Sequence, residues 1–405
     1  MKINVRSNTW WGPPKKFSAE NEERKVSWLE LFYDLVYVLA IAKITHHLAE
    51  HLSLSSLSQF FFFFTLIFWG WLNGSLYHDL HGSSGLRTRL MTLWQMLIVA
   101  ALVITLDSPE EQLVFNVTIV LLVMQLYITY LWWSVGFYDR SHRRLNRPYT
   151  ILFLASFGLM FSTFYLEQPY IQIAFYSALL LNYLPPFITH FLLRRDSMAL
   201  RLSASMSERL GLFTIIVFGE VIAGIINGVG ALPDLNIQSW VNFTLAVIIV
   251  FALWWLFFTL VSDRTCKPGF LNSSLLEMLY IPTLIALGLI GMSFSGIFEN
   301  YDHHDAHFIS QKEIFGYALC LFLLGINFMM YFLEYPPQYV RLRNRAQLII
   351  YAAIGLILIV TLLDLNVSLF YYLLIILSFI LGIIALLNYN WYAIFSEGQQ
   401  KQADV

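Results

Sequence analysis

Two short stretches of the sequence carry ionisable side chains among apolar neighbours. Glu30 and Asp34 lie in the first stretch, and Glu208, Arg209 and Glu220 in the second. An ionised side chain inside a membrane costs roughly 2.5–3.5 kcal/mol, so such residues are seldom placed there without a role. Carboxylates in this setting bind protons, cations or the charged group of a solute. We therefore take these five residues as candidates for ion or substrate binding.

Glu30 and Asp34 are four residues apart and share one face of a helix. Two carboxylates this close repel each other when both are ionised, which favours binding of a proton between them. A second interpretation stays open for Glu30, namely that it caps the start of a helix and remains solvated. Asp34 lies deeper in the same run, where it either acts in function or joins a polar network.

The elements that position these residues are membrane-crossing helices. The chain has 405 residues, of which 58% are hydrophobic and only 12% charged, against roughly 25% charged residues in soluble domains. About 20 apolar residues are needed to cross a bilayer. Twelve runs satisfy this and predict an all-α transmembrane bundle, over approximately 28–48, 57–77, 90–106, 112–135, 149–166, 170–193, 208–229, 238–261, 275–298, 313–335, 346–364 and 368–392.

The distribution of Lys and Arg predicts the orientation of the bundle. Of the 24 Lys and Arg residues, 21 fall in the two tails and in the loops that follow even-numbered spans, whereas the opposite loops hold only Lys312. Positive loops stay in the cytoplasm. We therefore expect a multi-pass plasma-membrane (inner-membrane) protein with both termini cytoplasmic and the lipid bilayer as its environment. The net charge of −2 and the absence of a basic, aromatic-interleaved segment argue against nucleic-acid binding.

The two halves of the sequence resemble each other. Glu30 opens the first span and Glu208 the seventh, 178 residues later, and the Trp71 and Trp255 regions end the second and eighth spans. Six spans per half would relate the repeats by an axis along the membrane normal. The alternative is that any two apolar helical arrays look alike. The predicted organisation is a cytoplasmic tail, a first six-helix repeat, a cytoplasmic linker, a second repeat and a cytoplasmic tail, at 1–27, 28–193, 194–207, 208–392 and 393–405.

The repeat places Glu220 beside the position of Lys43. Glu220 lies about 18 Å beyond Glu208 along a helix, near the bilayer midplane. We predict a Lys43–Glu220 ion pair in a central cavity, with a purely structural clamp or no contact as the alternatives. Gly219, Gly224 and Gly228 surround Glu220. They favour close helix packing, although a local break of the helix is a second interpretation.

The sequence shows no pattern typical of cofactor or metal chemistry. It contains no nucleophile elbow, Walker loop, dinucleotide-binding turn or HExxH motif, so we expect no cofactor. Histidines at spacings that suit a metal occur near the predicted outer face. A solvated loop is the preferred interpretation over a metal site for these histidines, which are His46, His47, His51, His303, His304 and His307.

Two segments carry a family resemblance. SWLELFYDLVYV, from Ser27 to Val38, resembles the ELFFDLVFV opening of the bacterial low-temperature-requirement A (LtrA) family, and ERLGLFTIIVFGE, from Glu208 to Glu220, resembles its ERfGLFtIIvlGE signature. The order and spacing fit a match over most of 26–390. The resemblance implies a plasma-membrane protein linked with growth in the cold. It implies functional roles for the matching positions Glu30, Asp34, Glu208, Arg209, Gly219 and Glu220.

The chain departs from the family pattern in one place. The eighth span usually ends in a Trp-Trp-x-Tyr-Phe-Asp motif, but here Thr259 stands where the acid is expected. Asp263, one turn later, is an open candidate for its replacement. Lys43 has no counterpart in the family pattern.

The leading functional hypothesis is a secondary transporter coupled to protons or another ion, with Asp34 and Glu220 as carriers and an unknown small solute. Three alternatives remain. The first is an ion channel, and the second is an intramembrane enzyme that modifies lipids with Glu30, Asp34, Glu208 and Arg209. The third is a structural membrane protein.

Overall fold

A computed structural model describes residues 26–50, 52–82, 85–138, 143–193, 202–262, 264–299, 310–363 and 367–403. Helices make up 89% of the structure, and no strand occurs among the described residues. The predicted all-α class is therefore confirmed. The only β-type pairing in this part of the chain is an isolated bridge between Cys266 and Leu333.

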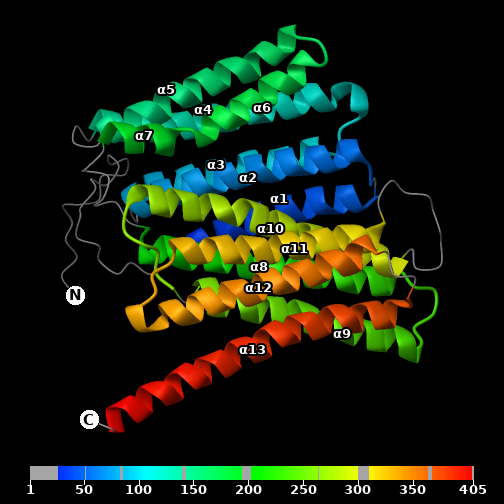
Figure 1. The fold of residues 1–405 in the computed structure, drawn as a ribbon. Coiled ribbons are helices and arrows are strands. Elements are labelled where there is room, and N and C mark those ends of the chain that lie inside the picture. Colours follow the sequence, from blue (N-terminus) through cyan, green and yellow to red (C-terminus); the bar gives the residue numbers. More distant parts are fainter. Residues whose placement is uncertain are drawn as a thin grey trace, which may run out of the picture. The chain divides into compact units, whose positions relative to one another are not determined.

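All twelve predicted spans are helical (Figure 1). The helices of the first half are α1 (Trp28–Glu50), α2 (Leu54–His81), α3 (Leu86–Thr105), α4 (Glu110–Tyr138), α5 (Arg143–Ser162), α6 (Tyr170–Tyr183) and α7 (Pro185–Leu193). Those of the second half are α8 (Ala204–Gly230), α9 (Ile237–Phe257), α10 (Phe270–Glu299), α11 (Gln311–Phe332), α12 (Val340–Leu362) and α13 (Leu369–Ala403).

Two of the spans are irregular for identifiable reasons. The sixth is divided into α6 and α7 at Leu184, directly before Pro185, because proline lacks the N–H that would continue the helical ladder. The eighth ends in a π-helical turn over Phe258–Ser262, after α9. Such turns often occur at functional positions.

Eleven helical segments of the described chain are long and apolar enough to cross a membrane. They correspond to the predicted spans from the second to the twelfth. The helix outside this set is α1, which has 23 residues and carries Glu30, Asp34 and Lys43. The coarse architecture is therefore a membrane protein with many spans, and the helix that carries Glu30 and Asp34 falls outside this set.

The chain forms two compact units, which are described separately. Unit 1 comprises residues 1–44, 58–213 and 268–274, and unit 2 comprises 45–57, 214–267 and 275–405. The division falls inside α1, α2, α8 and α10. The N-terminal part of α8, with Glu208 and Arg209, therefore belongs to unit 1, together with the helices of the first half.

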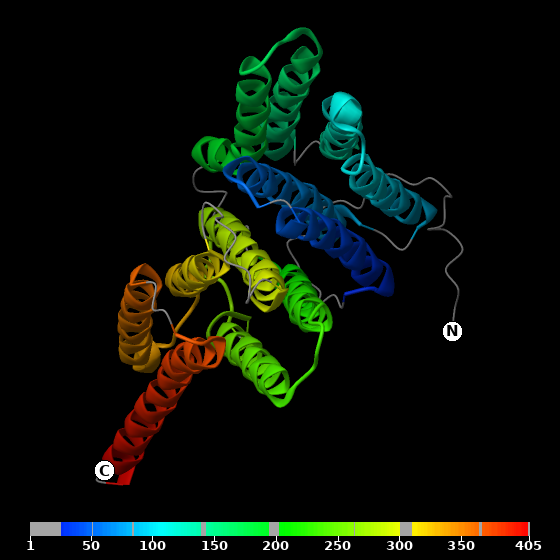
Figure 2. The same cartoon turned by 90° about the vertical axis from the view of Figure 1, so that its right-hand side faces the viewer.

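In unit 1, α4, α5 and α6 pack side by side, with α3 against α4 and α7 against α5 (Figures 1 and 2). The interior of this unit holds many polar side chains. Gln125 of α4 and Asn182 of α6 exchange two amide hydrogen bonds of 2.9 Å. Polar cross-links of this kind fix helix positions where the surroundings offer no water.

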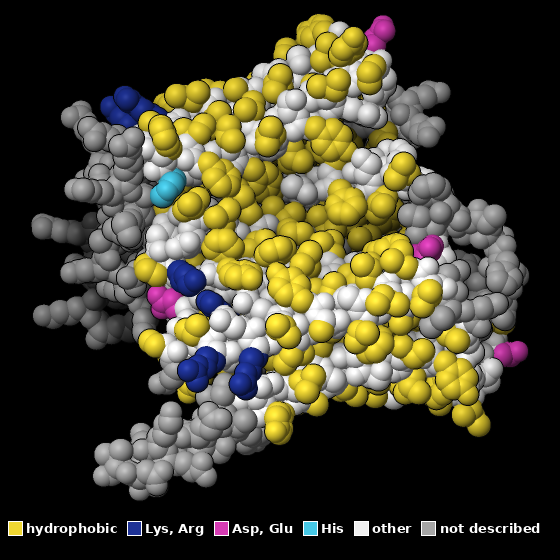
Figure 3. All heavy atoms as spheres, viewed as in Figure 1, with side chains coloured by type: hydrophobic (Ala, Val, Ile, Leu, Met, Phe, Trp, Pro, Cys, Tyr) yellow, Lys and Arg dark blue, Asp and Glu magenta, His cyan; other side chains and the backbone are white. Residues whose placement is uncertain are grey.

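In unit 2, α12 packs between α11 and α13, and α13 also contacts α9. The interior includes the stacked rings of Phe257 and Phe322, and a polar cross-link in which the Asn327 and Gln347 amides each donate to the other's backbone carbonyl at 3.2 Å. On the face drawn in Figure 3, hydrophobic side chains cover the middle of α12, and Lys and Arg side chains gather where this helix begins. An apolar belt bounded by charges is typical of a membrane-embedded surface.

Candidate functional site

Three charged side chains from α1 and α8 meet in the interior of unit 1. Arg209 and Asp34 are 0% exposed, and Glu30 is 4% exposed. Asp34 and Glu30 are one helical turn apart on α1, so both carboxylates face the same neighbour. Arg209 lies in the second turn of α8. The first two turns of α1 and of α8, which are far apart in sequence, therefore build the site.

The contact between Arg209 and Asp34 is bidentate. The guanidinium donates from Nη2 to Asp34 Oδ1, and from Nε to Asp34 Oδ2 at 3.4 Å. Arg and carboxylate groups match in this fork geometry, which gives both strength and a fixed orientation. Removing either partner would leave a charge buried without compensation.

Glu30 has two contacts at once. Its Oε1 lies 3.9 Å from Arg209 Nη1, within ion-pair distance. Its Oε2 accepts hydrogen bonds of 2.8 Å from the backbone N–H and the hydroxyl of Ser27, in front of the helix start. Glu30 therefore caps the N-terminus of α1, as one interpretation predicted, but the expectation that it remains solvated is wrong, because it is buried beside the arginine.

Aromatic side chains enclose the ion pair. The indole of Trp71 on α2 donates to Asp34 Oδ1 at 2.7 Å. The guanidinium of Arg209 lies 5.5 Å from the ring centroid of Tyr33 and 5.7 Å from that of Trp71. Phe213 contacts Trp71 with 4.4 Å between ring centroids. These rings exclude water, which strengthens the interaction between the charges, and their faces attract the cation.

A hydrogen-bonded chain continues from this site toward α3. Gln95 donates from Nε2 to the hydroxyl of Tyr37 at 2.8 Å and to the carbonyl of Gly70 at 2.9 Å. Gly74 keeps space for the chain, because a Cβ there would lie 2.2 Å from the Tyr33 hydroxyl. The buried Oε1 of Gln95 has no hydrogen-bond partner among the described residues.

The arrangement offers two acceptors to one cation. Asp34 holds Nη2 and Nε, whereas Nη1 faces Glu30 and makes no hydrogen bond within the described residues. When both acids are ionised, the three groups together carry one negative charge. A proton on one acid would neutralise the site, and an anionic group could then replace the protonated acid as a partner of Arg209. Such a site can exchange a proton or a charged ligand without leaving the arginine unpaired.

A family model described as bacterial low temperature requirement A protein (LtrA) matches residues 25–385 of the chain. The chain belongs to the LtrA family. The match runs from α1 into the first half of α13 and includes Glu30, Asp34 and Arg209. A comparison with curated proteins gave no match. Membership of the LtrA family therefore confirms the resemblance carried by the two sequence segments.

The other ionisable residues singled out in this LtrA-family sequence lie elsewhere. Glu208 is exposed, although its neighbour Arg209 on α8 is buried. In unit 1, Lys43 Nζ forms an ion pair of 2.9 Å with Asp107. Glu220 lies on the part of α8 in unit 2, where its side chain is half-buried. The predicted Lys43–Glu220 pair joins two units and stays a prediction.

The glycines around Glu220 differ in their surroundings. A Cβ on Gly224 would lie 2.3 Å from the carbonyl oxygen of Gly291, and one on Gly228 would lie 2.8 Å from that of Ser295, both on α10. These two positions therefore bring α8 and α10 into backbone contact within unit 2. Gly219 has no atom within 4 Å of such a Cβ, so its lack of a side chain is not required by packing.

The histidines near the predicted outer face bear on metal binding. Within the described ranges, no group of three or more His, Cys, Asp or Glu residues could hold a metal ion. His46 lies 3.4 Å from Glu50 as an exposed pair on α1. His51, the loop histidines His303, His304 and His307, and Asp263 lie outside the described residues.

Sequence reasoning missed most of the shell around the ion pair. Trp71 was noted only as part of the possible repeat, and its hydrogen bond to Asp34 had no signal in the sequence. Gln95, as a lone amide in an apolar run, did carry a signal, since polar side chains inside a membrane seldom lack partners. Tyr33 lies inside the family segment, but nothing in that segment distinguishes it from the other aromatic residues as a contact of the arginine.

Proposed function

We propose that this LtrA-family chain is a secondary transporter coupled to protons or another ion, and that Glu30, Asp34 and Arg209 form its binding site. The observation that carries the proposal is the shared arginine. Arg209 is fully buried, is bound by Asp34, and presents Nη1 to a second acid at 3.9 Å. A purely structural clamp needs one acid, whereas exchange of a ligand needs a second acceptor.

The exchange follows from charge balance. A proton delivered to Asp34 weakens its bond to Arg209, so the guanidinium turns to Glu30 or to an anionic group of the solute. Loss of the proton restores the bidentate pair. The two arrangements differ in which acid holds the cation, and a transporter needs two such states of similar energy.

Glu220 serves as a second ion carrier in this proposal. It lies on the same helix as Arg209, in an apolar segment, and its neighbour Gly219 leaves open space beside it. A half-buried acid in such a segment can be reached by protons and still be sensitive to its surroundings. Formation of the Lys43–Glu220 pair in one transport state is part of the same hypothesis.

We further infer a plasma-membrane location with both termini in the cytoplasm, two six-helix repeats of parallel topology, and a role in growth at low temperature. Orientation is supported by the Lys and Arg asymmetry, and the cold-growth role by family membership. Single cysteines placed at Asp234 and Arg341 test the orientation. A membrane-impermeant maleimide added to intact cells should label the first and not the second.

Proteoliposomes test the transport function. Purified full-length protein is reconstituted around an entrapped pH-sensitive dye, and proton movement is followed under an imposed pH gradient or potential. The measurement is repeated with a panel of small organic acids, amino acids and inorganic cations. We expect proton movement with wild type and at least one solute, and its loss with Asp34→Asn.

The matched control is Asp234→Asn, which removes an exposed acid of the loop before α9. It should move protons like wild type. Absence of proton movement in wild type, alone and with every solute of the panel, would overturn the proposal. Equal activity of Asp34→Asn and wild type would remove this site from it.

A further inference from the structure

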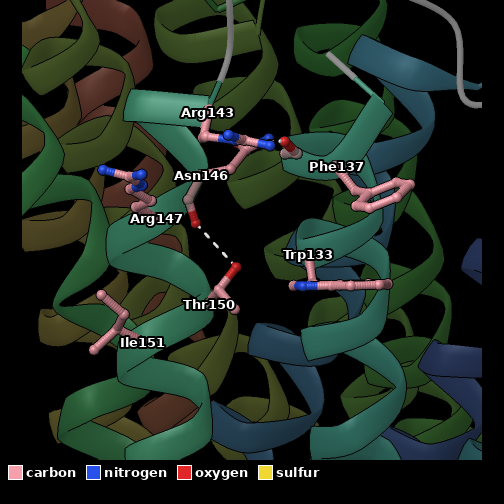
Figure 4. A pocket seen from close by; sticks show the side chains of 8 residues that line it. Trp133, Phe137, Arg143, Asn146, Arg147, Thr150 and Ile151 are labelled. Carbon is pink, nitrogen blue, oxygen red and sulfur yellow. Dashed lines mark hydrogen bonds between the residues drawn. The ribbon is translucent and has the colours of Figure 1, made fainter. Parts of the chain in front are cut away.

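A second polar site lies in unit 1 at the end of α4 and the start of α5, away from the ion pair. It is a pocket of about 280 Å³ lined by Trp133, Gly136, Phe137, Arg143, Asn146, Arg147, Thr150 and Ile151. Figure 4 shows α4 on one side of the pocket, with Trp133 and Phe137, and α5 on the other. The spans formed by these helices end at Tyr138 and begin at Asn146, which places the pocket at the membrane boundary.

Arg143 crosses the opening from α5 to α4. Its Nε donates to the carbonyl of Gly136 at 3.2 Å, and Figure 4 shows the side chain extended from α5 toward α4. This bond uses one of the five guanidinium N–H groups and holds the fork in place. Arg147, one turn further along the same helix, adds a second positive charge to the lining.

Asn146 contributes an unsatisfied amide to the same pocket. Its side chain is 1% exposed, and neither Nδ2 nor Oδ1 has a hydrogen-bond partner among the described residues. Buried side-chain amides are almost always paired, so an unpaired one in a pocket lining indicates a group that binds there. Nδ2 can donate to the oxygen of an anion held by the two arginines.

The remaining lining is apolar and open to the bilayer. Trp133 is 51% exposed, Phe137 59% and Ile151 64%. Rings at the boundary of a span lie at the level of lipid headgroups. A ligand that fits this pocket therefore carries an anionic group for the arginines and the amide, and hydrocarbon for the rings.

We propose that this pocket binds the phosphate headgroup of an anionic phospholipid. Arginine forks match phosphate oxygens and bind them by two parallel hydrogen bonds. Basic pockets between membrane helices are suited to anionic headgroups. The exposed rings beside the arginines favour a phospholipid over free phosphate, because only the phospholipid has hydrocarbon that can pack against them.

Native mass spectrometry of the full-length protein in detergent tests the assignment. Phosphatidylglycerol, phosphatidylcholine and inorganic phosphate are titrated separately into wild type, the double variant Arg143→Ala/Arg147→Ala, and Arg341→Ala. The last removes an exposed arginine at the start of α12 and serves as the matched control. We expect phosphatidylglycerol to bind wild type and Arg341→Ala alike, and the double variant about tenfold more weakly or worse.

Asn146→Leu separates ligand binding from helix packing. If the amide contacts the headgroup, this variant weakens phosphatidylglycerol binding several-fold while the thermal unfolding midpoint holds or rises. Should it fail to fold, Arg147→Ala alone, an exposed position, carries the test. Equal phosphatidylglycerol binding by the double variant and wild type would overturn the proposal. So would arginine-dependent binding of inorganic phosphate that phosphatidylglycerol does not displace.

Discussion

Buried charges join helices in unit 1, whereas a close backbone contact joins α8 and α10 in unit 2. Around α1 and α2 in unit 1, Asp34, Arg209 and Trp71 form a charged cluster with no exposed surface. In unit 2, α8 and α10 touch backbone to backbone at Gly224 and Gly291. A membrane helix pair needs only small residues to associate. Packing of the helices therefore accounts for the glycine contact, but it does not require the charged cluster.

The possible repeat sharpens this contrast. At the offset of 178 residues that aligns Glu30 with Glu208, Asp34 aligns with Leu212 and Arg209 with Leu31. Each half therefore supplies one partner of the ion pair, and neither supplies both. Trp71 is 0% exposed and bonds to Asp34, whereas Trp255, which aligns with it at an offset of 184 residues, is 45% exposed. If the halves share an origin, the site arose by divergence between them.

The largest expected effect is the loss of Arg209. Arg209→Met leaves Asp34 and Glu30 buried without a cation, and should lower the free energy of unfolding by about 3–5 kcal/mol. The double variant Asp34→Leu/Arg209→Met should recover most of this loss, because no charge is left buried. Denaturant titration of the purified protein in detergent measures both. If Arg209→Met were as stable as wild type, the interaction of Arg209 with Asp34 and Glu30 would not contribute to stability.

The tryptophan pair tests the contrast between the halves. Trp71→Phe removes the donor to Asp34 and should cost about 1.5–3 kcal/mol, the range for a hydrogen bond to a charged group. Trp255→Phe changes an exposed ring and should stay within about 0.5 kcal/mol of wild type. The same unfolding measurement compares them. Equal effects would mean that burial and the hydrogen bond to Asp34 do not distinguish the two positions.

In unit 2, the glycine contact should respond to a single methyl group. Gly224→Ala places a Cβ against the carbonyl of Gly291 and should destabilise by about 1–3 kcal/mol, as overpacking does. Gly219→Ala, in open space on the same helix, is the control and should be neutral or stabilising by up to about 1 kcal/mol. Thermal unfolding midpoints separate the two. A destabilised Gly219→Ala would contradict the packing account.

The smallest effect is expected at Lys43 and Asp107. This pair is partly exposed, with 35% and 60% of the side-chain surface accessible, so Asp107→Asn should cost less than about 1 kcal/mol. Its effect should shrink as salt is raised, because exposed charges are screened. Unfolding at low and high salt checks this. If Asp107→Asn lowered the free energy of unfolding as much as Arg209→Met, the Lys43–Asp107 pair would be as important for stability as the buried ion pair.

Much of the fold could be predicted from sequence because it follows from local rules. All twelve apolar runs are helical in the described chain, eleven of them as candidate membrane spans, and Pro185 accounts for the interruption of the sixth. Glu30, Asp34 and Arg209 were also identifiable, since charges in apolar runs are conspicuous. Their meeting was not, because it depends on the packing of α1 against α8, more than 170 residues apart in sequence. The same limit applies to Lys43, whose partner Asp107 lies in a loop.

The central claim is that the Asp34–Arg209 pair serves transport as well as stability. The most direct test is proton movement in proteoliposomes containing Asp34→Leu/Arg209→Met, a variant with the charges removed together. We predict that it folds, with an unfolding midpoint near that of wild type, and that it moves no protons under any gradient or solute that drives wild type. Proton movement at the wild-type rate would show that the pair is only a structural clamp.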